Sequence, residues 1–266
     1  MTITPEFMER ACRVIRATLL ELRPQLLESS GRIEHTIKAD TSVVTTMDAL
    51  VENRLHDTLA ELEPSIGFAG EETGADYDQP TFWLVDPIDG TEAFIRGLPF
   101  ATNMIALIHE DEPILSIIYN FTLDEFYYAT KGGGATMNGH PIHVSNRKLN
   151  RAYVIFASTI KNPKLEGAPT QLKHLVKGLL NTSSSGYEFS AIASGGLDGK
   201  ITYDTAGHEW DFAPGSLLVT EAGGRVQNIG SKKYNYRDVH LVASNPVIFD
   251  DLQDFIEGAI RGAEKA

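Results

Sequence analysis

The feature that most constrains this chain of 266 residues is the segment 82–91, where a short apolar run meets two aspartates. Residues 82–85 (Phe-Trp-Leu-Val) have the length and composition of a buried β-strand. Asp86 and Asp89 follow on either side of Pro87, which disfavours a helical conformation at the residue before it. Two carboxylates at the end of a buried strand are unfavourable without a counter-charge, which Mg²⁺ or Mn²⁺ bound through oxygen ligands supplies. The segment therefore predicts a divalent-cation site at the carboxyl end of a central strand.

The next two residues, Gly90 and Thr91, add turn and cap chemistry to the same segment. Their backbone N–H groups would form a seat for an anion beside the predicted cation site. Adjacent cation and anion sites indicate phosphate chemistry. The formal net charge of −13 disfavours nucleic acid and anionic membranes as partners, because phosphate groups bind Lys and Arg. A phosphate substrate would therefore have to be attracted by cations bound in the site.

Three features bear on the compartment of the protein. Cys12 is the only cysteine, which excludes an intrachain disulfide and fits a reducing environment. The first residues lack the basic and then apolar pattern of a signal peptide, and no apolar run approaches the ~20 residues of a membrane span. The sequence predicts a cytoplasmic protein with no membrane partner.

Helical and strand-like segments alternate along the chain, which favours a layered architecture of helices and mixed sheets. Hairpin signals between residues 103 and 130 exclude a purely parallel sheet. A polar stretch at 144–148 marks a soft boundary between an N-terminal α+β lobe, 1–148, and a C-terminal α/β lobe, 149–266. The expected helices are 5–29, 48–62, 170–180, 187–194, 211–222 and 247–263, and the expected strands are 33–46, 66–69, 82–85, 103–109, 114–121, 125–130, 151–158, 201–203, 225–227 and 239–243.

Two further acidic clusters lie at element boundaries. Glu71 and Glu72 follow the expected strand 66–69, and Asp211 begins an expected helix after Trp210. Taken alone, the first cluster is typical of a solvated turn and the second of a helix N-cap. The segment 86–91 (Asp-Pro-Ile-Asp-Gly-Thr) is more specific, because it joins a buried strand, two acids and a phosphate-type turn in six residues.

Taken together, these three motifs resemble the signatures of the inositol monophosphatase family, whose members are magnesium-dependent, lithium-sensitive phosphomonoesterases. The order and spacing of the motifs match from Lys38 to Gly224, which is most of the chain. The resemblance implies an α+β fold, a layered α-β-α-β-α sandwich of the sugar-phosphatase type with mixed sheets. It also implies a homodimer. The N-terminal lobe would carry most of the metal ligands, and the C-terminal lobe would carry Asp211 and the substrate contacts.

The resemblance implies specific roles for the matching residues. Two to three Mg²⁺ per site are implied, with Mn²⁺ possible as a replacement and Li⁺ as an inhibitor. Glu72 would orient a metal-bound water, and Asp48 would sit behind Thr91 and help its hydroxyl accept a water proton. The implied ligands of the first metal are Glu71, Asp86, the Ile88 carbonyl and Thr91; those of the second are Asp86, Asp89 and Asp211; and the phosphate would bind the N–H groups of Gly90 and Thr91.

The charges of the implied site balance. Four carboxylates bring four negative charges, which two Mg²⁺ cancel, so that a phosphate dianion meets a nearly neutral site. Without metal the carboxylates should repel one another, and some of their pKa values should rise. The hypothesis for the mechanism is an in-line attack of a metal-activated water on phosphorus, without a covalent phosphoenzyme.

The substrate is less closely specified. The resemblance implies that Ser184, Ser185 and Asp204 contact the alcohol part of an inositol, sugar or polyol phosphate. Tyr187 and Glu188 replace small or apolar residues of the family beside them, which leaves inositol specificity open. Two alternative substrates are 3′-phosphoadenosine 5′-phosphate, suggested by Lys38 and Asp40, and histidinol phosphate. The non-enzymatic alternative is a regulatory binding protein that retains the fold.

Overall fold

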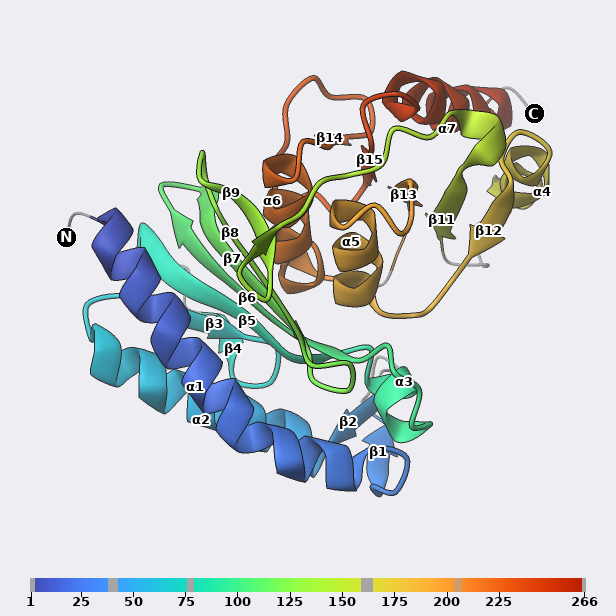
Figure 1. The fold of residues 1–266 in the computed structure, drawn as a ribbon. Coiled ribbons are helices and arrows are strands. Elements are labelled where there is room, and N and C mark those ends of the chain that lie inside the picture. The colour runs from blue at the N-terminus through green and yellow to red at the C-terminus, as the bar shows by residue number, and fades with distance from the viewer. Residues whose placement is uncertain are drawn as a thin grey trace.

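The computed structural model describes residues 3–37, 43–75, 79–158, 165–203, 205 and 207–264. Within this part of the chain, the strands form an eight-stranded, a five-stranded and a two-stranded sheet. Helices cover both outer faces of the two larger sheets and fill the space between them (Figure 1). The five layers confirm the predicted α-β-α-β-α architecture.

The first layer consists of α1 (Pro5–Ser29) and α2 (Thr46–Leu62), which lie across one face of the eight-stranded sheet (Figure 1). Both helices begin at a threonine whose hydroxyl accepts a backbone N–H, Thr4 in α1 and Thr45 in α2. Each helix buries one stripe against the sheet. The buried apolar residues are Phe7, Ala11, Ile15, Leu19, Leu22 and Leu26 in α1 and Met47, Val51, Leu55 and Leu59 in α2.

The eight-stranded sheet confirms the predicted hairpins. Its strands run in the order β10-β9-β8-β7-β6-β5-β3-β4, and β3 and β5 form its parallel pair. From β5 to β10 each strand pairs antiparallel with the next along the chain. The strands are β3 (Gly67–Gly70), β4 (Gly74–Ala75), β5 (Thr81–Asp89), β6 (Thr102–His109), β7 (Glu112–Asn120), β8 (Glu125–Thr130), β9 (Gly134–Met137) and β10 (His140–Pro141). The small sheet pairs β1 (His35–Ile37) with β2 (Val43–Thr45).

The third layer, between the two large sheets, contains α5 (Ser185–Ala193) and α6 (Ala213–Glu221). Beyond it lies the five-stranded sheet, in the order β12-β11-β13-β15-β14, whose outer face is covered by α4 (Ala168–Lys173) and α7 (Phe249–Glu264). Its strands are β11 (Tyr153–Ala157), β12 (Gly178–Leu180), β13 (Gly199–Thr202), β14 (Arg225–Asn228) and β15 (Leu241–Ser244).

One expected helix is wrong in its second half. Leucines at 172, 175 and 179 predicted a helix over 170–180, but α4 ends at Lys173 and Gly178–Leu180 forms the edge strand β12. Leu179 pairs with Val154 of β11 in a parallel register. Gly178 allows this approach, because a Cβ there would meet the Tyr153 ring at 2.6 Å. Strand pairing therefore overrides the helical spacing.

The predicted boundary at residue 148 falls between β10 and β11. However, α5 and α6, which follow the boundary, pack on strands that precede it in one shared core. The division into two lobes therefore stays a prediction. No helix among the described residues is long and apolar enough to cross a bilayer.

Candidate active site

A pocket of about 430 Å³ opens at the carboxyl end of β5. It is lined by Glu71 after β3, by Asp86 and Asp89 of β5, and by Asp211 at the end of the short 3₁₀ helix η3 (Glu209–Asp211). We call these four residues the acidic side of the pocket. One carboxylate oxygen from each of the three aspartates lies within 4.8 Å of the other two. Residues far apart in the sequence thus converge on one point.

An irregularity in β5 turns the two aspartates into the pocket. The strand continues to Asp89, further than the expected 82–85, with a register shift between Asp86, which faces Met104, and Asp89, which faces Thr102. Pro87, in the bulge, cannot donate a ladder hydrogen bond, and its carbonyl accepts one from Asn103 Nδ2 at 2.6 Å. The proline that argued against a helix therefore shapes a bulged strand end.

Burial raises the pKa values of all three aspartates. Burial, followed by the charges of Glu71 and Asp211, holds the pKa of Asp86 well above its ordinary value. Burial, followed by the charge of Asp89, raises the pKa of Asp211 to about 7. Asp86 is 1% exposed, and its Oδ1 has no hydrogen-bond partner among the described residues. An unpartnered buried oxygen among converging carboxylates is the donor set that a hard divalent cation fits.

Asp89 differs from its neighbours because α5 begins against it. Its Oδ1 accepts the N–H of Ser185 at 2.9 Å, and its Oδ2 accepts the N–H of Gly186 at 2.8 Å and the Thr102 hydroxyl at 2.9 Å. The Ser184 hydroxyl lies 2.5 Å from the same Oδ2 and 2.7 Å from the Phe100 carbonyl. Burial still raises the pKa of Asp89, against the lowering effect of these contacts. These partners fix the carboxylate's orientation.

Ser184 therefore has a structural position as well as its implied substrate role. It is 1% exposed and is the N-cap of α5, where its hydroxyl oxygen accepts the N–H of Tyr187. Its close neighbour is Gly90, which adopts φ +77° and has no room for a side chain, since a Cβ would meet Ser184 Cβ at 2.7 Å. The tight contact joins the turn after β5 to the start of α5.

The loop that carries Glu71 and Glu72 is held by Glu52 of α2, a residue outside the three sequence motifs. Glu52 is 0% exposed, and its two carboxylate oxygens accept the N–H groups of Glu72 at 2.9 Å and Thr73 at 2.7 Å. Gly70 leaves room for this carboxylate, because a Cβ would meet the Glu52 carboxyl carbon at 2.4 Å and displace it from its two hydrogen bonds. The available signal was spacing, since Glu52 lies four residues after Asp48 and beside the buried stripe of α2.

The two residues implied to activate water are both close to the acidic side, but no hydrogen bond joins them in the described structure. The Thr91 hydroxyl donates to the Ile88 carbonyl at 3.0 Å, at the start of α3 (Thr91–Ile95). Asp48 Oδ2 accepts the N–H of Thr45 at 2.8 Å and its hydroxyl at 2.6 Å, completing the cap of α2. Asp48 Oδ1 is buried and has no hydrogen-bond partner among the described residues, and burial raises the pKa of Asp48 to about 6.

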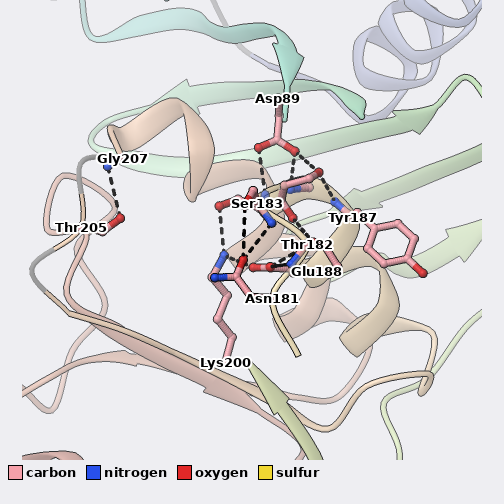
Figure 2. A network of polar contacts seen from close by, with 12 residues as sticks. Asp89, Asn181, Thr182, Ser183, Tyr187, Glu188, Lys200, Thr205 and Gly207 are labelled. Atoms are coloured by element: carbon pink, nitrogen blue, oxygen red, sulfur yellow. Dashed lines mark hydrogen bonds and ion pairs between the residues drawn. The ribbon is translucent and has the colours of Figure 1, made fainter. Parts of the chain in front are cut away.

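The wall opposite the acidic side is built from residues 181–188 and Lys200 of β13, and we call it the serine wall. Figure 2 shows this segment lying between Asp89 on one side and Lys200 on the other. Lys200 Nζ lies 2.7 Å from Glu188 Oε2 and 2.9 Å from Ser185 Oγ. In the sequence, Glu188 stands out only as a departure from the family pattern, and Lys200 is not part of any motif. A lysine in the buried strand β13 was the signal for an internal ion pair.

His208, two residues before Trp210, stacks on the Trp210 ring with ring centroids 4.6 Å apart, and its backbone N–H donates to Asp211 Oδ2. Two sequence expectations fall on residues that the structure does not describe. Asp204, implied to contact substrate, lies outside the described residues. Lys38 and Asp40, which suggested a nucleotide substrate, also lie outside them.

Comparisons with known proteins agree with this geometry. Residues 6–260 match the model of the inositol monophosphatase family. An inositol monophosphatase of Mesembryanthemum crystallinum is 31% identical over 240 residues, which cover 85% of this chain and 87% of the relative. The solved structure of the Thermotoga maritima IMPase is 25% identical with a TM-score of 0.84, over 94% of this chain and 99% of that one. An IMPase/NADP phosphatase solved with Mg²⁺ and phosphate is 20% identical with a TM-score of 0.82, over 93% and 95%, and shows the shared fold.

Proposed function

Since the chain belongs to the inositol monophosphatase family and is a phosphoric monoester hydrolase, we propose that it hydrolyses a small polyol or sugar phosphate with the help of Mg²⁺. The observation that carries this proposal is the convergence of Asp86, Asp89 and Asp211 within 4.8 Å, beside Glu71 in one pocket. Four carboxylates in one pocket match the charge of two divalent cations.

The residues present divide into two ligand sets around Asp86. Asp86, Asp89 and Asp211 would hold one cation, and Glu71, Asp86, Thr91 and the Ile88 carbonyl would hold another. When bound, such cations polarise the phosphoryl group and lower the pKa of water enough for it to attack at neutral pH. Mn²⁺ fits the same oxygen ligands, and Li⁺ is the expected inhibitor. The fold-related IMPase/NADP phosphatase was solved with Mg²⁺ and phosphate, which supports the choice of cation.

The chain's own residues would bind the phosphate, orient the attacking water and take a proton from it. The N–H groups of Gly90 and Thr91 would bind the phosphate at the start of α3. Because the Thr91 hydroxyl donates to the Ile88 carbonyl, its oxygen lone pairs can accept a hydrogen bond from the attacking water. Asp48 Oδ1, buried and without a partner in the described part of the chain, is the atom that would take the proton. The pKa of Asp48, raised to about 6, suits a base near neutral pH. Glu72 would help orient the water.

The identity of the alcohol follows from the relatives and from the serine wall. The curated relatives are inositol monophosphatases of plants, a slime mould, bacteria and vertebrates, at 28–33% identity. Ser185 and Asn181 line the pocket and can bind hydroxyl groups of an alcohol. Ser184 and Asp204 complete the substrate contacts that we propose. We expect a cytoplasmic homodimer, without nucleic-acid or membrane partners.

One assay tests the proposal and its alternatives together. Phosphate release is measured from inositol 1-phosphate, glycerol 2-phosphate, 3′-phosphoadenosine 5′-phosphate and histidinol phosphate, with Mg²⁺, with EDTA, and with added Li⁺. The proposal expects release from the polyol phosphates that requires Mg²⁺ and falls with Li⁺. Faster turnover of the nucleotide or of histidinol phosphate would support those alternatives. No release from any substrate would overturn the proposal and favour a regulatory binding protein.

A further inference from the structure

The serine wall contains a buried ion pair that the ligand sets do not use. The side chains of Lys200 and Glu188 are 1% and 3% exposed, and both residues line the pocket. Glu188 is held at both oxygens, because Oε2 accepts from Lys200 and Oε1 accepts the N–H and the hydroxyl of Thr182 at 3.1 and 3.0 Å. The rings of Phe189 and Phe212 lie 4.8 and 5.3 Å from Lys200 Nζ. A charge so enclosed keeps one position.

The ion pair determines what the Ser185 hydroxyl can do. An ammonium group donates three hydrogen bonds and accepts none, so in the 2.9 Å contact Lys200 is the donor and Ser185 Oγ is the acceptor. The single proton of the serine is therefore directed away from Lys200. Within the described part of the chain that hydroxyl donates no hydrogen bond, while Ser185 lines the pocket. Its proton is thus left for a group bound in the pocket.

The backbone of Ser185 is held by a separate contact that does not involve Lys200. Its N–H donates to Asp89 Oδ1 at 2.9 Å, at the first residue of α5. Asp89 therefore fixes the position of Ser185 through its backbone N–H, and Lys200 fixes the orientation of its hydroxyl. A donor fixed in this way binds an oxygen of the leaving alcohol. An ammonium group could use only the remaining lone pair of Ser185 Oγ, and there it would lie beside the ammonium of Lys200, where like charges repel.

We propose that Lys200, held by Glu188, is a positioning residue that fixes the Ser185 hydroxyl as a hydrogen-bond donor to the alcohol part of the substrate. The pocket therefore selects phosphates whose alcohol carries a further hydroxyl over phosphates of amino alcohols. This inference rests on the proposed phosphatase function and names its substrate class. It places the discrimination in a residue pair that departs from the family pattern at Glu188.

Three matched substrates test the selection: 2-hydroxyethyl, ethyl and 2-aminoethyl phosphate, which differ in one group. The wild-type protein should hydrolyse the hydroxyethyl ester with a kcat/KM about 5- to 10-fold above that of the ethyl ester, and should disfavour the aminoethyl ester most. Ser185→Ala should lower kcat/KM for the hydroxyethyl ester about 5- to 10-fold, mainly through KM, and leave the ethyl ester within about twofold. Ser194→Ala, at the far end of α5 and outside the pocket, is the matched control.

The role of Lys200 is tested with both charges removed, because Lys200→Met alone leaves Glu188 buried without a partner and can prevent folding. The double variant Lys200→Met with Glu188→Gln should lose the preference for the hydroxyethyl ester as Ser185→Ala does, and adding Ser185→Ala to it should cause no further loss.

Equal loss on all three esters in the double variant would overturn the inference, because it would show a purely structural ion pair. An unchanged preference in Ser185→Ala would also overturn it. These outcomes require an active wild type. The absence of phosphate release from every substrate, inositol 1-phosphate included, would instead count against the proposed function.

Discussion

The acidic side and the serine wall both bury charge at the same pocket, but they balance it differently. On the acidic side, Asp86 and Asp211 take part in no ion pair within the described structure, and their pKa values are raised. On the serine wall, Glu188 and Lys200 neutralise each other at 2.7 Å, and backbone and hydroxyl groups satisfy the rest of the carboxylate. The comparison teaches that Asp86 and Asp211 find no ion-pair partner within the described residues, which fits the proposed cations, whereas the ion pair of the serine wall is complete within the chain. Metal removal should therefore affect the two sides unequally.

The largest expected effect comes from Asp86→Asn, which sharpens the comparison by removing one charge from the acidic side. Asp86 is shared between both proposed ligand sets, so kcat/KM with Mg²⁺ should fall at least about 1,000-fold. In EDTA the same variant should melt at a higher temperature than the wild type, because an unpaired buried carboxylate is removed. A fall in kcat/KM together with a rise in the melting temperature would identify Asp86 as a metal ligand. Near wild-type activity would refute the shared position.

The second effect is a pH dependence of the metal-free protein. The pKa values of Asp48 and Asp211 are raised from 3.8 to about 6 and about 7, so the folded state binds more protons than the unfolded state in this range. The stability that follows is present at low pH and is lost as pH rises through the folded-state pKa values. Between pH 5 and 8 the free energy of unfolding in EDTA should therefore fall, on the order of 2–4 kcal/mol.

Added Mg²⁺ provides the contrast in this pH experiment. The cation replaces the protons on the acidic side, so it should stabilise the protein most at pH 8 and least at pH 5. Chemical denaturation at each pH, with Mg²⁺ and with EDTA, measures both trends. A stability in EDTA that rises with pH would mean that the acidic side does not carry raised pKa values.

The third effect tests whether the acidic side depends on the hydrogen bonds that Glu52 accepts from the loop carrying Glu71. Glu52→Gln leaves the N–H of Glu72 or of Thr73 facing an amide NH₂ group and loosens the loop that carries Glu71. Activity and Mg²⁺ affinity should fall about 10- to 100-fold, as for other groups that orient metal ligands. Glu61→Gln, exposed on the same helix, is the control and should change neither quantity. Equal activity of the two variants would show that the loop holds itself in place.

The two sides of the pocket could be predicted from the sequence to different extents. Asp86 and Asp89 of the acidic side lie around Pro87 in one local motif, so adjacent residues already indicate their chemistry. Glu71 and Asp211 were assigned to the same site only through the resemblance to the family. The structure places these residues together, while their ligand roles stay predictions.

The serine wall and the supporting residues depend on pairings that no local pattern contains. Glu188 and Lys200 are 12 residues apart and meet because α5 packs against β13, and Glu52 meets a loop 20 residues away. Likewise, the spacing of leucines at 172–179 could not show that β11 offers an edge to Gly178–Leu180. Long-range packing decides which partners these residues meet. The sequence could therefore indicate that Glu52 or Lys200 is buried, but not which groups it contacts.

The smallest effect concerns Asp89, the one residue where the two sides meet. Thr102→Val keeps the shape of a fully buried side chain but removes one of the hydrogen bonds to Asp89 Oδ2, while the N–H groups of Ser185 and Gly186 remain. Losing one of several donors should weaken Mg²⁺ binding about fivefold, which corresponds to about 1 kcal/mol. Thr202→Val is the matched control, because Thr202 is equally buried and its hydroxyl has no partner in the described structure. Mg²⁺ titrations of phosphatase activity compare the two variants. If they weaken Mg²⁺ binding equally, the hydrogen bond from Thr102 does not hold Asp89 for the metal, and α5 alone connects the serine wall to the acidic side.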